Sequence, residues 1–192
     1  MKKIYLTLIL VCTNLQAQIN IYSHRHYDSD KILFKKFTDQ TGIKINVIKG
    51  SADQLIERLI SEGGNSPADI LFTVDAGRLH RAKVAGILQP IESKILRENI
   101  PPSMRDEDDY WFGLTVRARV LVYSKERVTP DQLSTYEDLA NRKWRGKIAV
   151  RSSSNIYNQS LMASIIASNG SRKALSWAKS IRKNMARAPR GS

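Results

Sequence analysis

The stretch Ile19-Asn20-Ile21-Tyr22-Ser23-His24-Arg25-His26-Tyr27 decides the fold, because a short apolar run leads directly into polar and aromatic side chains. Residues 19–22 predict a β-strand, and residues 29–40 predict a helix. We place four apolar residues on the inner side of this helix: Ile32, Leu33, Phe34 and Phe37. Gly42 is suited to end it, and the β-branched run at 43–48 predicts a second strand.

The alternation of helices and strands continues to about residue 86. Ser51 is expected to cap a helix that ends at Gly63-Gly64, with four apolar residues on its inner face: Leu55, Ile56, Leu59 and Ile60. Residues 68–74 predict a third, buried strand, and residues 77–85 predict a helix. Strands separated by helices indicate a mainly parallel sheet covered on both faces. Ligands of such sheets bind beyond the carboxyl ends of the strands.

The pattern changes beyond residue 100. Pro101-Pro102 and the acidic run at 106–109 predict a surface loop. Residues 111–123 predict a long extended segment that crosses into a second lobe, and residues 148–150 predict another strand. Two helices are predicted to follow, on either side of Asn169-Gly170: residues 157–168 and 171–183.

The start of the chain has the pattern of a secretory signal peptide over residues 1–17. Lys2 and Lys3 precede an apolar run that is too short to span a bilayer, and Ala17 is a small residue suited to cleavage. Cys12 is the only cysteine, so the mature chain would have neither a disulfide nor a thiolate metal site. These features favour a protein of the bacterial periplasm.

The formal net charge is +13, which raises the alternative of a basic nucleic-acid-binding protein. Lysine and arginine are scattered along the chain, however, and no aromatic-interleaved RNA-binding motif is present. We therefore expect a solvated basic surface and no nucleic acid partner; steeply salt-dependent DNA binding would favour the alternative. The sequence has no Gly-x-Ser-x-Gly elbow and no phosphate-binding glycine loop, so we expect a binding protein and not an enzyme.

Several short motifs are distributed along nearly the whole mature chain, at residues 22–27, 74–79, 111–115, 117–120, 144–147 and 151–160. Together they resemble the periplasmic ferric-iron-binding proteins of ABC importers, in particular the subgroup that binds iron with one histidine and several tyrosines. The resemblance implies an α/β, periplasmic binding protein-like fold, with two lobes of mainly parallel sheets joined by a strand hinge. We expect lobe one over residues 18–115 and a partial lobe two over residues 116–192.

The resemblance also implies a set of metal ligands: His26 and Tyr27 from lobe one and Tyr157 from lobe two. Arg25 is expected either to hold an anion or to offset the charge of a phenolate. A tyrosine that binds ferric iron loses its proton, so affinity should fall in acid. The alternative is that His26 and Tyr27 are polar loop residues and that Tyr157 packs in the core.

Other residues near these motifs are expected to support the site. Asp75 and Thr115 are expected to help form the cleft, and Arg117 and Arg119 to line or brace the hinge. Three serines before Tyr157 are expected to cap its helix. His24 is not expected to be a ligand.

The sequence departs from the family in one respect: no tyrosine follows Tyr157, so the family's adjacent tyrosine pair is missing. We expect an N-terminal fragment in which the second lobe and the return to the first are incomplete, and in which iron binding is weakened. The resemblance implies Fe³⁺ as the transported ligand, with or without a carbonate-like synergistic anion, a monomeric protein and an inner-membrane ABC permease as partner. Two alternatives stay open, a small-anion-binding protein of the same fold and an inactive remnant.

Overall fold

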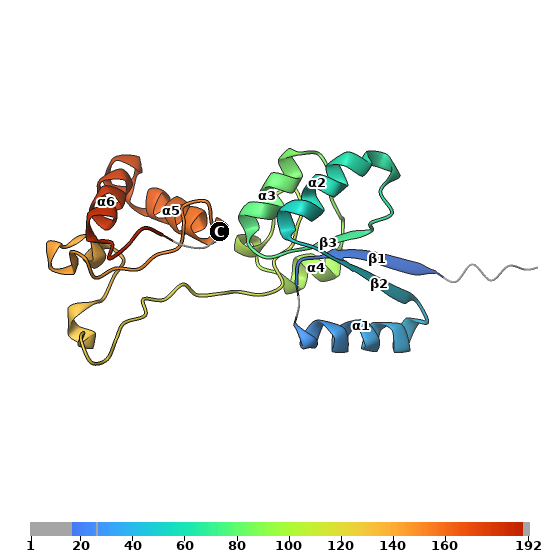
Figure 1. Ribbon diagram of the computed structural model, residues 1–192. Helices are drawn as coiled ribbons and strands as arrows, with labels where there is room; N and C mark the ends of the chain where they lie inside the picture. Colours follow the sequence, from blue (N-terminus) through green and yellow to red (C-terminus); the bar gives the residue numbers. More distant parts are fainter. Residues whose placement is uncertain (1–16, 26, 190–192) are drawn as a thin grey trace, which may run out of the picture. The chain divides into compact units, whose positions relative to one another are not determined.

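The computed structural model describes residues 17–25 and 27–189 (Figure 1). The predicted signal peptide, apart from Ala17, and the predicted ligand His26 lie outside the described residues. The chain divides between Val74 and Asp75 into two compact units, here called the N-terminal unit and the C-terminal unit. The expected division into lobes at residues 115 and 116 stays a prediction. Within the described ranges, no helix is both long and apolar enough to cross a membrane.

The N-terminal unit is a three-stranded parallel sheet with helices on its two faces. Its elements are β1 (Gln18–Ser23), α1 (Asp28–Thr41), β2 (Lys44–Lys49), α2 (Ala52–Glu62), the 3-10 helix η1 (Gly63–Asn65) and β3 (Ile70–Phe72). The strand order is β2-β1-β3, and both pairings are parallel. Figure 1 shows α1 and α2 on opposite faces of this sheet. The predicted parallel arrangement is therefore confirmed, but the prediction of a buried strand over 68–74 is wrong, because β3 is shorter and Ile70 at its start is exposed.

The central strand β1 carries the core of this unit. Ile21 and Tyr22 are buried, and each is paired in register with residues of both neighbouring strands. At the carboxyl end of β1, Ser23 pairs with Lys49 and Phe72. The polar residues after Ser23 therefore leave the sheet at the edge where parallel α/β sheets bind ligands.

The inner face of α1 differs from the prediction. Ile32 is 69% exposed and Leu33 is 62% exposed, whereas Phe34 and Phe37 are half-buried. Residues advance by about 100° around a helix, so Ile32 points away from the side that carries Phe34. The residue of α1 that is buried is Asp30, at the same helical face as the two phenylalanines. The end of the helix is as predicted, with Gly42 in the left-handed conformation at a φ of 72°.

The capping of α2 follows the prediction. The Ser51 side chain accepts a hydrogen bond from the Gln54 amide, and the Gln54 side chain accepts one from the Ser51 amide, which completes a capping box. Three of the predicted inner residues are buried: Leu55, Ile56 and Leu59. Ile60 is instead exposed.

The C-terminal unit is built from helices and long loops. Its helices are α3 (Ala76–Val84), α4 (Lys94–Asn99), η2 (Pro102–Met104), η3 (Pro130–Gln132), η4 (Glu137–Ala140), η5 (Arg142–Trp144), α5 (Ile156–Asn169) and α6 (Ser171–Asn184). The predicted helices at 157–168 and 171–183 are confirmed as α5 and α6. A core cluster in this unit is formed by Trp144, Ile148 and Ile181.

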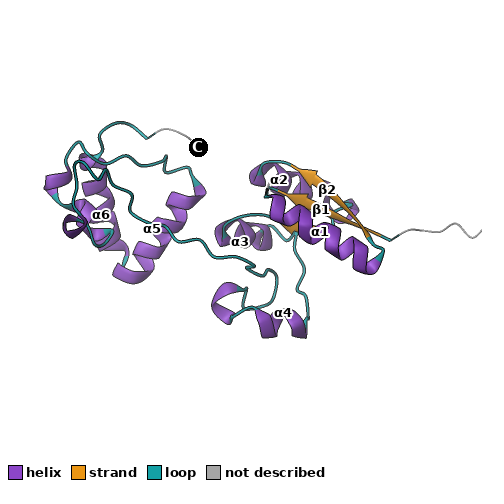
Figure 2. Cartoon of the chain, turned by 90° about the horizontal axis from the view of Figure 1, so that it is seen from below, coloured by secondary structure: helices purple, strands orange, loops and turns teal. Residues whose placement is uncertain are grey.

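Strands appear only in the N-terminal unit among the described residues (Figure 2). The predicted strand at 148–150 is wrong, because Ile148 makes a single parallel bridge with Met185 and no ladder follows it. The predicted extended segment at 111–123 likewise contributes one isolated bridge, between Arg105 and Phe112. With no ladder to cover it, the segment exposes four aliphatic side chains: Leu114, Val116, Val120 and Val122.

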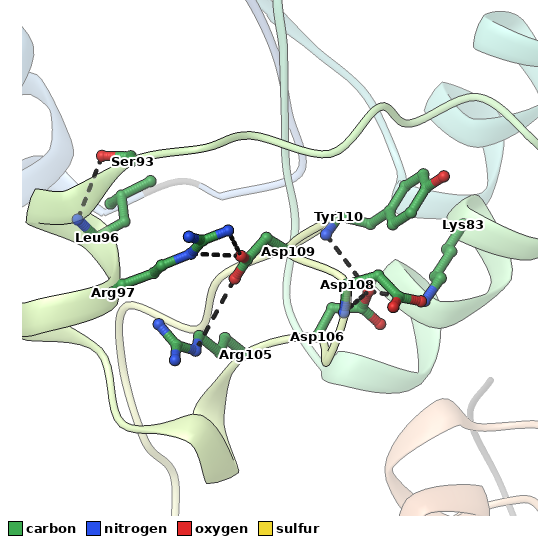
Figure 3. Close-up of polar contacts among 9 residues, drawn as sticks. All are labelled: Lys83, Ser93, Leu96, Arg97, Arg105, Asp106, Asp108, Asp109 and Tyr110. Atoms are coloured by element: carbon green, nitrogen blue, oxygen red, sulfur yellow. Dashed lines mark hydrogen bonds and ion pairs between the residues drawn. The ribbon is translucent and has the colours of Figure 1, made fainter.

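The prediction of a surface loop at 106–109 is correct for Glu107 and Asp108, which are exposed, and wrong for Asp106 and Asp109. The carboxylates of Asp106 and Asp109 are buried and paired with basic side chains (Figure 3). Lys83 donates to Asp106 at 2.7 Å and to Asp108 at 2.8 Å, and Arg97 donates to Asp109 at 2.6 Å. Because buried carboxylates are stable only when they are paired, the loop is fixed by α3 and α4.

Candidate metal centre

The carboxyl end of β1 is held by its two neighbouring strands. The amide of His24 donates to the carbonyl of Phe72 at 3.0 Å, so the contact with β3 continues one residue beyond the end of β1. The His24 Nδ1 lies 3.3 Å from the carbonyl oxygen of Gly50, so one ring nitrogen already has a main-chain partner. The contact involves one ring nitrogen only, so the expectation that His24 is not a metal ligand stays a prediction.

Arg25 is nearly buried and paired with a carboxylate. Its Nε and Nη2 donate to the two oxygens of Asp30, at 3.0 Å each, and about 10% of its side chain is exposed. The hydrogen bonds to Asp30 raise the pKa of Arg25 above its usual value. The guanidinium carbon lies 5.0 Å from the ring centroid of Tyr27 and 4.6 Å from that of Phe72. This geometry favours the expected role beside Tyr27 over the capture of a free anion.

Tyr27 stands immediately before α1, as its N-cap residue. Its backbone is extended, and its carbonyl accepts a hydrogen bond from the Asp30 amide at 3.1 Å. Because the side chain is 39% exposed, the phenol has access to solvent. The Arg25 guanidinium lies against the ring, and the main chain of Tyr27 begins the helix.

Tyr157 also stands at the beginning of a helix, in the first turn of α5. The cap of this helix is Asn155, whose side-chain oxygen accepts from the Tyr157 amide at 3.1 Å. The prediction that the preceding serines cap the helix is therefore wrong. An asparagine oxygen directly before the helix reaches the free amide, whereas Ser152 and Ser154 hydrogen-bond to each other at 2.8 Å.

Two arginines from the extended segment surround Tyr157. Arg117 donates from Nη1 to the phenol oxygen at 3.0 Å, and the guanidinium carbon of Arg119 lies 4.3 Å from the ring centroid. Tyr157 is half-buried, and its oxygen is engaged by a polar partner. The contacts place positive charge where the oxygen of a metal-bound phenolate carries negative charge. Thr115, by contrast, is exposed, and its expected role stays a prediction.

Asp75 connects Arg119 to α5. Its carboxylate accepts from the Ser160 hydroxyl at 2.8 Å and 2.9 Å, and one of its oxygens lies 3.6 Å from Nη2 of Arg119. It also caps α3 by accepting from the Gly77 amide at 3.0 Å. Ser160 was not identified from the sequence. Its position one turn beyond Tyr157 on the same helix is the signal that points to it.

The two tyrosines share one local arrangement. Each lies at a helix N-terminus, and each has a guanidinium within 5.0 Å of its ring centroid. Helix N-termini and cations both favour negative charge nearby. Phenolate oxygens with this support are suitable donors for a hard trivalent cation. Over residues 17–25 and 27–189, no cluster of three or more histidine, cysteine, aspartate or glutamate side chains has the geometry of a metal site.

The class of protein is defined by its fold, which is the periplasmic binding protein fold. Residues 65–191 match the family described as bacterial extracellular solute-binding protein, and the chain belongs to this family. The structure is similar to that of a Trichodesmium protein, IdiA or FutA, solved in complex with iron and citrate ligands. The TM-score is 0.87 and the identity 57%, over 92% of this chain and 56% of that one.

Two further relatives carry iron in their names. The chain is 54% identical over 177 residues to iron uptake protein A1 of Synechocystis, a match that covers 92% of this chain and 49% of that protein. It is also similar to a ferric binding protein from Campylobacter jejuni, with a TM-score of 0.82 and 45% identity over 90% of this chain and 55% of that one. The chain thus spans about half the length of the curated relatives that it matches.

Proposed function

We propose that this protein is a periplasmic solute-binding component of a ferric-iron ABC importer, with Fe³⁺ as its transported cargo. The observation that carries the proposal is its similarity, over nearly all of its length, to a relative solved with iron and citrate. The tyrosine sites support it, because each supplies a hard oxygen donor beside a guanidinium. As a solute-binding protein it has no catalytic step. Its partner is an inner-membrane permease, and it acts as a monomer.

We propose His26, Tyr27 and Tyr157 as the iron ligands. The imidazole of His26 would bind as its neutral form and the two phenols as phenolates, so binding releases protons and weakens as the pH falls. Ferric iron takes six ligands in octahedral sites, so three protein donors leave positions for water or for a carbonate-like anion. Arg25, which is paired with Asp30 and lies against the Tyr27 ring, would offset phenolate charge there.

The test is a titration of the purified full chain with ferric citrate, followed by the visible phenolate-to-iron charge-transfer band. We expect the wild type to develop this band and Tyr27→Phe and Tyr157→Phe each to weaken it. Tyr136→Phe is the matched control, because Tyr136 accepts from the Trp177 indole through its main-chain carbonyl, which the substitution retains. A band that both ligand variants retain at full strength would contradict the proposed ligands.

A small-anion function is the second candidate, and the geometry favours it less. Arg25 was expected to hold such an anion, yet both oxygens of Asp30 already occupy its guanidinium. The hydroxyls of Ser152 and Ser154, which precede Tyr157, are likewise engaged, in a hydrogen bond to each other. Calorimetric titration with phosphate and with sulfate, each without iron, separates the two functions. Binding of either anion that is lost in Arg25→Lys would favour the anion function.

A further inference from the structure

We infer that Asp75 is a positioning residue for Tyr157: it fixes Arg119 and the first turns of α5 so that the phenol oxygen is presented for metal binding. The inference rests on the proposed function and deepens it by adding a residue that does not touch the metal. It depends on contacts within the C-terminal unit alone.

The first step of the argument is the number of elements that converge on one carboxylate. Asp75 accepts from Ser160 of α5, from the amide of Gly77 in α3, and lies 3.6 Å from Arg119 of the extended segment. Its side chain is 8% exposed. A buried carboxylate with this many donors has little freedom to move, so it holds its partners in fixed positions.

The second step is that both side-chain partners of Asp75 act on Tyr157. Ser160 lies three residues beyond Tyr157 on α5, so its hydroxyl fixes the rotation of the turn that carries the phenol. Arg119 places its guanidinium carbon 4.3 Å from the Tyr157 ring centroid. Asp75 therefore influences the position of the Tyr157 ring in two ways. It fixes α5 through Ser160, and it fixes Arg119, which lies against the ring.

The third step is the backbone of Asp75 itself. Its φ of 75° lies in the left-handed region, which costs free energy for a residue other than glycine. Such conformations persist where the surroundings determine them, and they gather at functional sites. A glycine would adopt this backbone more easily but would lose all three contacts. An aspartate at this position is thus explained by what its carboxylate holds.

The main chain beside Asp75 is closely packed at Gly77. A Cβ added at Gly77 would lie 3.1 Å from the Asp75 Oδ1 and 3.4 Å from the Cδ1 of Ile156. The chain at the start of α3 therefore passes close to the residue that begins α5. Because α3 and α5 approach this closely beside Tyr157, small shifts of the carboxylate should be transmitted to the ring.

The experiment uses the full chain labelled with 3-fluorotyrosine, in which Tyr157→Phe identifies the resonance of Tyr157. Asp75→Asn keeps the side-chain shape, but it removes the charge that faces Arg119. Ser160→Ala removes the hydroxyl donor, and Ser160→Thr restores it. We expect the Tyr157 resonance to move in Asp75→Asn and in Ser160→Ala, and to stay near its wild-type position in Ser160→Thr. The matched controls are Asp131→Asn and Ser176→Ala, both at exposed positions.

Ferric citrate titration of the same proteins gives the second readout. Loss of groups that orient a metal ligand typically lowers metal affinity by about 10- to 100-fold, and we expect roughly tenfold for Asp75→Asn and Ser160→Ala. An unmoved Tyr157 resonance in both variants would overturn the inference, and so would a moved resonance with wild-type iron affinity. A wild type without a charge-transfer band would instead overturn the proposed function and the ligation part of this inference. The fluorine resonance would then still decide whether Asp75 places the Tyr157 ring.

Discussion

The guanidinium of Arg25 and the carboxylate of Asp30 form two parallel hydrogen bonds of 3.0 Å, and both side chains are about nine-tenths buried. The pair adjoins Tyr27, because the guanidinium carbon of Arg25 lies 5.0 Å from the centroid of that ring. One ion pair thus links the first turn of α1 to the end of β1. Loss of this ion pair should destabilise the N-terminal unit and change the position of Tyr27, the proposed ligand.

The first prediction concerns this ion pair. Asp30→Ala leaves a buried guanidinium without its carboxylate, and breaking a buried pair in this way costs about 3 kcal/mol in the free energy of unfolding. Urea denaturation measures the loss. The matched control is Asp39→Ala, which breaks the exposed pair between Lys35 and Asp39 and should cost less than about 0.5 kcal/mol. Equal losses for the two variants would show that burial of the Arg25 pair has no energetic consequence.

The second prediction concerns the start of α2. Ser51→Ala removes the acceptor of the Gln54 amide and one half of the capping box, so unfolding should become easier by about 1 kcal/mol. Ser51→Asp retains an acceptor and should recover most of this loss. Thermal unfolding monitored by circular dichroism measures both variants. Loss of the same stability in Ser51→Asp would mean that the cap does not act through its acceptor.

The third prediction concerns a close approach in the C-terminal unit. A Cβ added at Gly113 would lie 2.7 Å from the carbonyl oxygen of Met104, which the Gly113 amide also contacts as a hydrogen-bond donor. Gly113→Ala should therefore force the two segments apart and destabilise the protein by about 1–3 kcal/mol. Gly64→Ala, where nothing lies within 4 Å of the added Cβ, is the control. Denaturant midpoints that fall equally in both variants would contradict a steric cause.

The fourth prediction concerns acid. Burial acts to raise the pKa of Asp106, but hydrogen bonds from Lys83 and from the amides of Tyr110 and Asp108 hold it below its usual value. The unfolded state therefore takes up the proton first as the pH falls, and the stability from this carboxylate is lost below about pH 4. Asp106→Asn should make the free energy of unfolding less dependent on pH in that range.

Urea denaturation at a series of acidic pH values checks this prediction. Asp131→Asn, at an exposed position in the same unit, should keep the wild-type slope. If Asp106→Asn also kept that slope, the Lys83 pair would not be a source of acid sensitivity.

Local patterns predicted the N-terminal unit well. The β-branched runs, the cap at Ser51 and the glycine at position 42 each specify one element by a short-range rule, and each appears in the structure. The inner face of α1 could not be predicted, because the consecutive apolar residues there fit more than one helical face. The buried Asp30 on that face depends on Arg25, a partner that periodicity does not reveal.

The C-terminal unit shows what local patterns leave out. Residues 148–150 have strand-forming side chains, yet a strand exists only where another segment supplies a ladder. The acidic run at 106–109 predicts a surface loop, and the burial of Asp106 and Asp109 follows from Lys83 and Arg97, which lie in other elements. Burial of a charge is decided by its partners, and these are distant in sequence.

In the candidate site, too, the contacts between distant residues could not be predicted from local patterns. The motifs around Tyr27 and Tyr157 predicted both tyrosines as ligands, which stays a proposal, and the structure shows Arg25 against the first ring and Arg119 against the second. Ser160 was missed because its role arises from Asp75, which is 85 residues away in the sequence. Coupling of this kind is set by the packing of α3 and α5, and no local pattern contains it.

The aliphatic row of Leu114, Val116, Val120 and Val122 has a practical consequence for the purified protein. Alternate side chains of an extended segment point the same way, and an uncovered segment of this kind is a template for adding strands from other molecules. Concentrated samples should therefore self-associate through this segment. A lysine in place of Val122, which is 89% exposed, should keep them dispersed at little cost to folding.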